Sequence, residues 1–165
     1  MTQITPKEIT TTALLTALVF IATFVPHIPI PLGYAHLGDA VIFILVLMVN
    51  RRTSLIAACI GSALADFLGG FPLWIIPTLI IKAGMVEVVR YTLNVANKKR
   101  NKFWITVAFI FSSLWMAIAY TLFGALLSSS LAAGLASLPG LLLEGLLNTI
   151  IAVLLYPIVS RTIRI

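Results

Sequence analysis

Six apolar runs, each bounded by charged, proline or glycine residues, follow one another along the whole chain. They cover residues 9–25, 35–49, 53–68, 73–95, 103–127 and 138–159. Of the 165 residues, 61% are hydrophobic and only 10% are charged, whereas a soluble domain has about 25% charged residues. Because lipid offers the backbone no hydrogen bonds, runs of this kind are expected to form helices. The sequence therefore predicts an all-α polytopic membrane protein, in which residues 1–165 form a single bundle of six transmembrane helices.

The second and third runs are short for a membrane span. A run of about 15 residues covers only ~23 Å of helix, less than the ~30 Å thickness of the hydrocarbon core. We expect these two helices either to thin the bilayer locally or to pack against longer neighbouring helices.

The positions of the basic residues predict the orientation of the bundle. Nine of the eleven lie at one set of connections and termini: Lys7, Arg51, Arg52, Lys98, Lys99, Arg100, Lys102, Arg161 and Arg164. The opposite loops, VPHIPIPLGY, GGFP and SSSLAAGLASLP, hold no lysine or arginine. Under the positive-inside rule both termini are cytoplasmic and these three loops face outward. The net charge of +6 is therefore interpreted as a topology signal, with the lipid bilayer and not nucleic acid as the surrounding partner.

Several charged residues lie within the apolar runs. Lys82 is about nine residues inside the fourth run, which places it ~13 Å below the outer end of that helix. A lysine or aspartate at a helix centre costs roughly 2.5–3.5 kcal/mol, so such a residue normally faces the bundle and has a partner. Three of the five acids, Asp39, Asp66 and Glu144, lie toward the outside. They predict a pocket open to the outside, and the alternative is that Asp39 and Asp66 only cap helices or pair with Lys82.

Aromatic and hydrogen-bonding side chains are expected at the same level of the bundle. Tyr34 belongs to the first outer loop, Phe71 and Trp74 flank the second, and Thr78 and Asn148 lie one or two turns inside. These residue types suit stacking on a flat, uncharged heteroaromatic ligand and hydrogen bonding to its ring substituents. Trp74 has a competing interpretation as an interfacial belt residue.

The first outer loop also carries three prolines and His27, and His36 follows two residues after its last residue, Tyr34. His27 and His36 lack the spacing of a metal site, so hydrogen bonding in the loop or pocket is favoured over metal binding. Because the prolines restrict the backbone, VPHIPIPLGY is predicted to form a semi-rigid extended lid.

The chain carries no phosphate-binding loop, nucleophile elbow or metal cluster, so the sequence predicts neither an enzyme nor a cofactor. Accumulation of a solute would require a partner that hydrolyses ATP. In the first run, Ala13 and Ala17 are four residues apart with Thr12 and Thr16 beside them. This small-residue face would allow another helix to approach closely.

These motifs follow a recognisable order: the alanine motif, the proline-rich loop leading to YAHLGDAV, then GSALADFLGGFPLW, then PTLIIKAG. In that order they resemble the substrate-binding S components of energy-coupling factor (ECF) vitamin transporters, over essentially the full chain. The resemblance implies a multi-pass protein of the bacterial cell membrane that captures a vitamin from outside. It implies docking through Ala13 and Ala17 on a T component driven by two cytoplasmic ATPases, followed by toppling that releases the vitamin inward. The implied substrate-binding residues are Tyr34, His36, Asp39, Asp66, Trp74, Thr78, Lys82, Glu144 and Asn148.

Within that family, the residues of these motifs are most similar to those of the branch assigned to hydroxymethylpyrimidine or vitamin B6 compounds such as pyridoxine. The branches for pantothenate, niacin, riboflavin and folate share parts of these motifs. The nickel and cobalt branch is disfavoured, because the N-terminal MTQITPKE has no histidine.

Two other functions are considered from the residues. The main alternative is a self-contained small oligomeric transporter or ion channel, in which Lys82, Asp66 and Asp39 relay protons or ions. An intramembrane enzyme that uses Glu144 or Asp66 is disfavoured, because no paired nucleophile and base appears at useful spacing.

Overall fold

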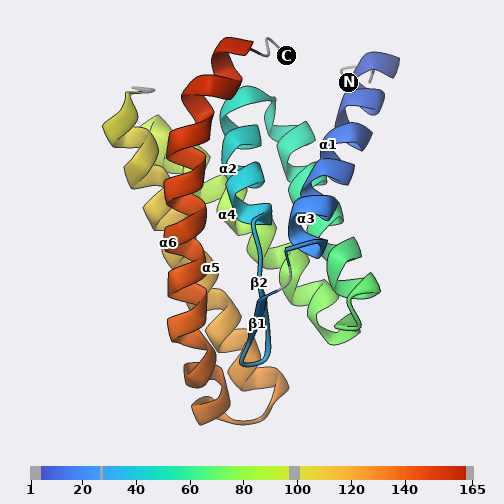
Figure 1. The fold of residues 1–165 in the computed structure, drawn as a ribbon, viewed down its shortest axis with the longest axis vertical. Helices are drawn as coiled ribbons and strands as arrows, with labels where there is room; N and C mark the ends of the chain where they lie inside the picture. Colours follow the sequence, from blue (N-terminus) through green and yellow to red (C-terminus); the bar gives the residue numbers. More distant parts are fainter. Residues whose placement is uncertain (1–4, 27, 97–100, 163–165) are drawn as a thin grey trace.

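The computed structural model describes residues 5–26, 28–96 and 101–162, which form six α-helices and one small β-hairpin (Figure 1). The helices are α1 (Pro6–Phe24), α2 (Gly38–Met48), α3 (Arg51–Leu68), α4 (Ile75–Val95), α5 (Lys102–Leu127) and α6 (Leu131–Thr162). The hairpin strands are β1 (Ile28–Ile30) and β2 (Gly33–Ala35), and a 3-10 turn, η1 (Pro72–Trp74), precedes α4. The predicted all-α, six-helix membrane fold is confirmed.

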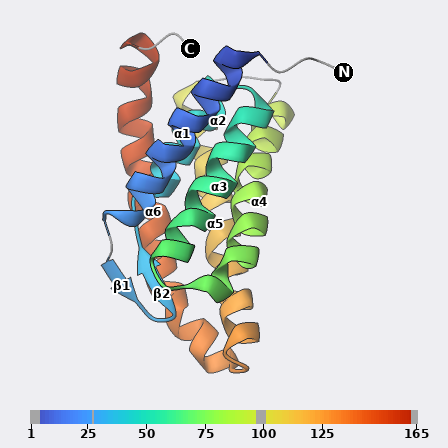
Figure 2. The ribbon, with the colours of Figure 1, turned by 90° about the vertical axis from the view of Figure 1, so that its right-hand side faces the viewer.

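The helices run roughly along one axis, and both ends of the described chain lie at the same end of the bundle (Figure 1). Four segments are long and apolar enough to cross a membrane: α1, the continuous stretch from η1 through α4, α5, and α6. The turns between α3 and α4 and between α5 and α6 lie at the opposite end (Figures 1 and 2). This arrangement agrees with two termini on one side of the membrane.

The second helix is shorter than the run at residues 35–49 suggested. α2 has 11 residues and a length of about 16 Å, roughly half the thickness of the hydrocarbon core. The difference arises because Ala35 belongs to β2 and the helix begins only at Gly38. Short apolar segments fit either conformation, so the pattern of apolar residues does not show where the strand ends and the helix begins.

α2 lies at the centre of the bundle, and its residues are nearly all buried. Phe43 stacks on Phe109 of α5, with their ring centroids 4.6 Å apart. At its C-terminus, the Arg90 guanidinium donates hydrogen bonds to the carbonyl oxygens of Val46 and Val49, at 3.4 and 3.0 Å. Arg90 thus satisfies carbonyls that the end of a short helix leaves without helical partners.

The third outer connection is also shorter than predicted. Residues 128–139 were expected to form a loop, but α6 already begins at Leu131 and continues through Pro139. Membrane helices tolerate an internal proline because neighbouring groups satisfy the freed backbone. Close packing supports the added turns, since a Cβ on Gly134 would lie 2.7 Å from the Cβ of Ala125 on α5.

The predicted extended lid is a β-hairpin. Its strands pair antiparallel, with Ile28 opposite Ala35 and Ile30 opposite Gly33. Leu32 turns the chain with a φ of 65°, in the left-handed region. Ile30 packs against α6 at Gly140, where a Cβ would lie 3.0 Å from the Ile30 side chain. The hairpin therefore lies against the outer half of the bundle (Figure 2).

Candidate functional site

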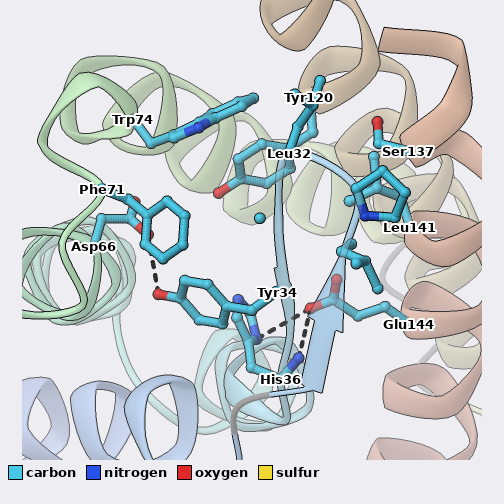
Figure 3. Close-up of a pocket in the computed structure, with 13 residues that line it drawn as sticks. Leu32, Tyr34, His36, Asp66, Phe71, Trp74, Tyr120, Ser137, Leu141 and Glu144 are labelled. Atoms are coloured by element: carbon cyan, nitrogen blue, oxygen red, sulfur yellow. Dashed lines mark hydrogen bonds and ion pairs between the residues drawn. The ribbon is translucent and has the colours of Figure 1, made fainter. Parts of the chain in front are cut away.

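A pocket of about 470 Å³, including its open mouth, lies beneath the hairpin between the outer ends of the helices (Figure 3). Its lining residues are Ile30, Pro31, Leu32, Gly33, Tyr34, His36, Asp66, Phe71, Trp74, Tyr120, Ser137, Leu141 and Glu144. Five of the nine predicted binding residues are among them: Tyr34, His36, Asp66, Trp74 and Glu144. The other four, Asp39, Thr78, Lys82 and Asn148, are buried and linked to these through the contacts described below.

Tyr34 joins the hairpin to the outer end of α3. Its hydroxyl donates a 3.0 Å hydrogen bond to Oδ1 of Asp66. The Tyr34 ring lies 5.3 Å from Phe71 and 5.7 Å from His36, measured between ring centroids. Burial and the neighbouring Asp66 carboxyl raise the pKa of Tyr34, so its hydroxyl keeps its proton and remains a donor.

His36 lies between the hairpin and α2, and side chains of α6 hold it there. Its backbone N–H donates to Oε1 of Glu144 at 3.2 Å, and its Nδ1 lies 3.1 Å from the same oxygen. The Asn148 amide donates to the His36 carbonyl at 2.8 Å. Its Oδ1 accepts from the Ala40 N–H at 2.9 Å, so Asn148 also binds the first turn of α2.

The buried charges of Lys82 and Asp39 form an ion pair between α4 and α2. Each side chain is 1% exposed. The sequence left open whether Asp39 would pair with Lys82, and the structure brings the two together. This pair lies outside the pocket wall but next to it, since the Lys82 ammonium is 5.4 Å from the ring of the pocket residue Tyr120.

Tyr120 connects the ion pair to the aromatic wall, and the sequence reasoning missed it. Its ring lies 5.5 Å from Trp74, and its hydroxyl shares a 3.0 Å hydrogen bond with Thr78. Tyr120 occurs in a long run with no charged residue, and Ser112, Ser113 and Thr121 carry hydroxyls in the same run, so its own hydroxyl did not single it out. Ser137 was missed because its segment was assigned to a loop.

The residues that the structure describes contain no group of three or more histidine, cysteine, aspartate or glutamate side chains able to hold a metal ion. His27 lies outside the described residues.

At the other predicted site, Ala13 and Ala17 are exposed on α1. They line a separate groove, together with Ile56, Ile60 and Leu64 of α3.

The architecture defines a class: a polytopic membrane protein with a small-molecule pocket at the end opposite its termini. A solved structure of the S component of a bacterial ECF transporter has the same fold, with a TM-score of 0.75 and 17% identity. The match covers 94% of this chain and 96% of that one. The family model described as "ECF-type riboflavin transporter, S component" matches residues 3–161, and the chain belongs to this family.

A further relative, an uncharacterised protein in the gap 3' region of Pyrococcus woesei, is 31% identical over 110 residues. That alignment covers 64% of this chain and 74% of the relative. The family assignment confirms the predicted S-component membership, and the protein is a multi-pass membrane subunit of a transporter and not an enzyme.

Proposed function

We propose that the protein captures a small heteroaromatic vitamin from outside the cell and presents it to an ATP-driven ECF transporter. The observation that carries this proposal is the pocket under the hairpin, with aromatic walls and buried hydrogen-bonding groups at the end opposite the termini. Tyr34, Phe71, Trp74 and Tyr120 offer ring faces for stacking, while Asp66 and Glu144 offer polar partners.

In this proposal, uptake depends on a T component and two cytoplasmic ATPases. The chain has no phosphate-binding loop of its own, so it can bind a solute but needs these partners to accumulate it. Ala13 and Ala17 leave the outward face of α1 flat enough for close helix packing, which supports their role as the docking site.

Two groups of ligands are the leading candidates. Riboflavin is one, because the family description names it. Hydroxymethylpyrimidine and pyridoxine are the other, because the order and residues of the sequence motifs are most similar to that branch. The hairpin residues Ile30, Leu32 and Tyr34 line the pocket, so a three-ring ligand with a side chain would require the hairpin to move outward.

The proposal is tested by purifying the full chain in detergent and identifying any bound small molecule by native mass spectrometry. Riboflavin, hydroxymethylpyrimidine, pyridoxine and pantothenate are then titrated by calorimetry. We expect one ligand to bind with one-to-one stoichiometry and to be weakened by Trp74→Ala. If none of these ligands binds, and the protein alone conducts ions in liposomes, the capture role is wrong and the channel alternative is supported.

A further inference from the structure

Asp66 has a buried carboxylate oxygen that lacks a hydrogen-bond donor among the described residues. Oδ1 accepts the hydrogen bond from Tyr34, whereas Oδ2 is buried and accepts none from the residues that the structure describes. The Asp66 side chain lines the pocket, and the residue is only 8% exposed. A buried acceptor without a donor is unfavourable, so such a group in a native pocket calls for a partner that arrives from elsewhere.

The other buried acids beside the pocket have close partners. Lys82 forms an ion pair with Asp39, and Oε1 of Glu144 accepts a hydrogen bond from the His36 backbone N–H. The printed hydrogen bond to Asp66 comes from a neutral hydroxyl, and Lys82 acts on Asp66 by electrostatic attraction and not by an ion pair.

A second hydroxyl lies beside Asp66. Thr78 interacts with the Asp66 carboxyl, but its hydroxyl is also engaged in the 3.0 Å hydrogen bond with Tyr120. Asp66 therefore has no ion-pair partner within 4 Å among the described residues, although its carboxyl lines the pocket.

Aromatic rings surround this carboxyl. Tyr34 and Phe71 lie beside Asp66, and Trp74 forms the adjoining wall of the pocket (Figure 3). Ring faces next to a carboxylate suit a flat ligand that stacks on the rings and donates a hydrogen bond from its edge. A charge-assisted hydrogen bond of this kind is about twice as strong as a neutral one.

We propose that the Asp66 carboxylate is the specificity determinant of the pocket and accepts a hydrogen bond from the ring edge of the ligand. That ligand is a heteroaromatic ring with an amino substituent or a protonated ring nitrogen. A ring edge in which one N–H is flanked by two carbonyl oxygens, as in riboflavin, fits less well because its oxygens would be repelled by the carboxylate. The inference rests on the proposed function and names the ligand chemistry of the same site.

The test uses two matched probes with the purified full chain. One is 4-amino-5-hydroxymethyl-2-methylpyrimidine, and the other carries a methyl group in place of the ring amino group. Calorimetry should show that the unmodified protein prefers the amino probe. Asp66→Asn should weaken the amino probe by about 10- to 100-fold while changing the methyl probe little, because it removes the charged acceptor.

Two variants control this experiment. Asp66→Glu keeps the charge and should retain part of the preference. If Asp66→Asn fails to fold, the preference of the unmodified protein for the amino probe over the methyl probe still tests the inference. Glu87→Gln alters an ion pair between α3 and α4 whose side chains are largely exposed, and should bind both probes as the unmodified protein does.

The outcomes separate this inference from the proposed function. If riboflavin or another vitamin binds tightly while Asp66→Asn has no effect, or if the two probes bind equally well, the role of Asp66 is wrong and vitamin capture stands. If no vitamin of the panel binds at all, the proposed function fails and this inference fails with it.

Discussion

Lys82 and Asp39 show how this chain places charges inside a membrane. Both side chains are 1% exposed, and each compensates the other. A buried ion pair contributes little net stability compared with apolar residues, but removing one partner leaves an uncompensated buried charge. The main effect of this ion pair is therefore to fix the relative positions of α2 and α4 beneath the pocket.

Replacing Lys82 by methionine should destabilise the protein by about 3–5 kcal/mol, because Asp39 loses its counter-charge. Thermal unfolding in detergent measures the effect. Glu87→Gln is the control, since it weakens a pair with 65% and 44% exposed side chains and should cost no more than about 1 kcal/mol. The double variant Lys82→Met with Asp39→Leu should recover much of the loss, and equal effects of Lys82→Met and Glu87→Gln would contradict this account.

Tyr34 should give the protein a stability change at alkaline pH. Its pKa is raised in the folded state, so its contribution is fully present below the ordinary tyrosine pKa of about 10 and decreases as the pH rises above it. Melting temperatures measured from about pH 8 to about pH 11 should fall more steeply for the unmodified protein than for Tyr34→Phe. Identical slopes for the two proteins would show that the Tyr34 hydroxyl is not held as a donor by Asp66.

At the scale of helices, α1 is held against α3 through a glycine. A Cβ on Gly61 would lie 2.7 Å from the carbonyl oxygen of Thr16 and 2.8 Å from the Cβ of Val19. Nearer the end of the bundle that holds the termini, the hydroxyls of Thr12 and Thr53 form a 3.2 Å hydrogen bond between the same helices. Close approach of the backbones therefore positions the helix that carries Ala13 and Ala17.

Gly61→Ala should destabilise the protein by about 1–3 kcal/mol, because a rigid backbone and a β-branched side chain block the added methyl group. The loss should appear although alanine is intrinsically the better helix former. Gly33→Ala is the matched control, since a Cβ there meets no atom within 4 Å. Thermal unfolding of the two variants compares them, and an unchanged melting temperature for Gly61→Ala would exclude tight packing at this contact.

The elements themselves were predictable to different degrees. α5 begins at Lys102 and ends at Leu127, within one residue of the apolar run, because the polar segments on both sides are clear. The start of α6 was not predictable, since glycine and proline end helices in water but are accommodated by packing in a membrane bundle. The β-hairpin was missed as a strand pair, although the prolines correctly indicated an extended backbone.

At the scale of the whole molecule, binding and transport should be separable. Ala13→Leu with Ala17→Leu should leave ligand affinity unchanged, because these residues lie on a groove of their own, apart from the pocket. The same change should abolish ATP-driven uptake in liposomes that contain the partner subunits, because the larger side chains hold the docking helix away. Ala132→Leu, at another exposed position, is the control and should transport normally.

Loss of ligand binding in the double variant Ala13→Leu with Ala17→Leu would contradict this separation of binding and transport. Normal uptake by that variant would show that α1 does not dock through Ala13 and Ala17. Binding is measured by calorimetry and uptake with radiolabelled vitamin, each on the same protein preparation.

The sequence by itself determined the membrane class, and it predicted the orientation of the bundle and the level of the pocket. Whether a segment lies in lipid or in water depends on its own hydropathy and charge, so these features can be predicted from each stretch of the sequence separately. Only the tertiary structure decided which polar groups meet. The Asn148 side chain accepts a hydrogen bond from the N–H of Ala40, which lies 108 residues away in the sequence. Lys82 forms its ion pair with Asp39 and not with Asp66 or Glu144. These pairings depend on how the helices are rotated and packed against one another, which the sequence of a single helix does not encode. For the same reason, only the tertiary structure shows that Oδ2 of Asp66 is buried without a hydrogen-bond donor among the described residues.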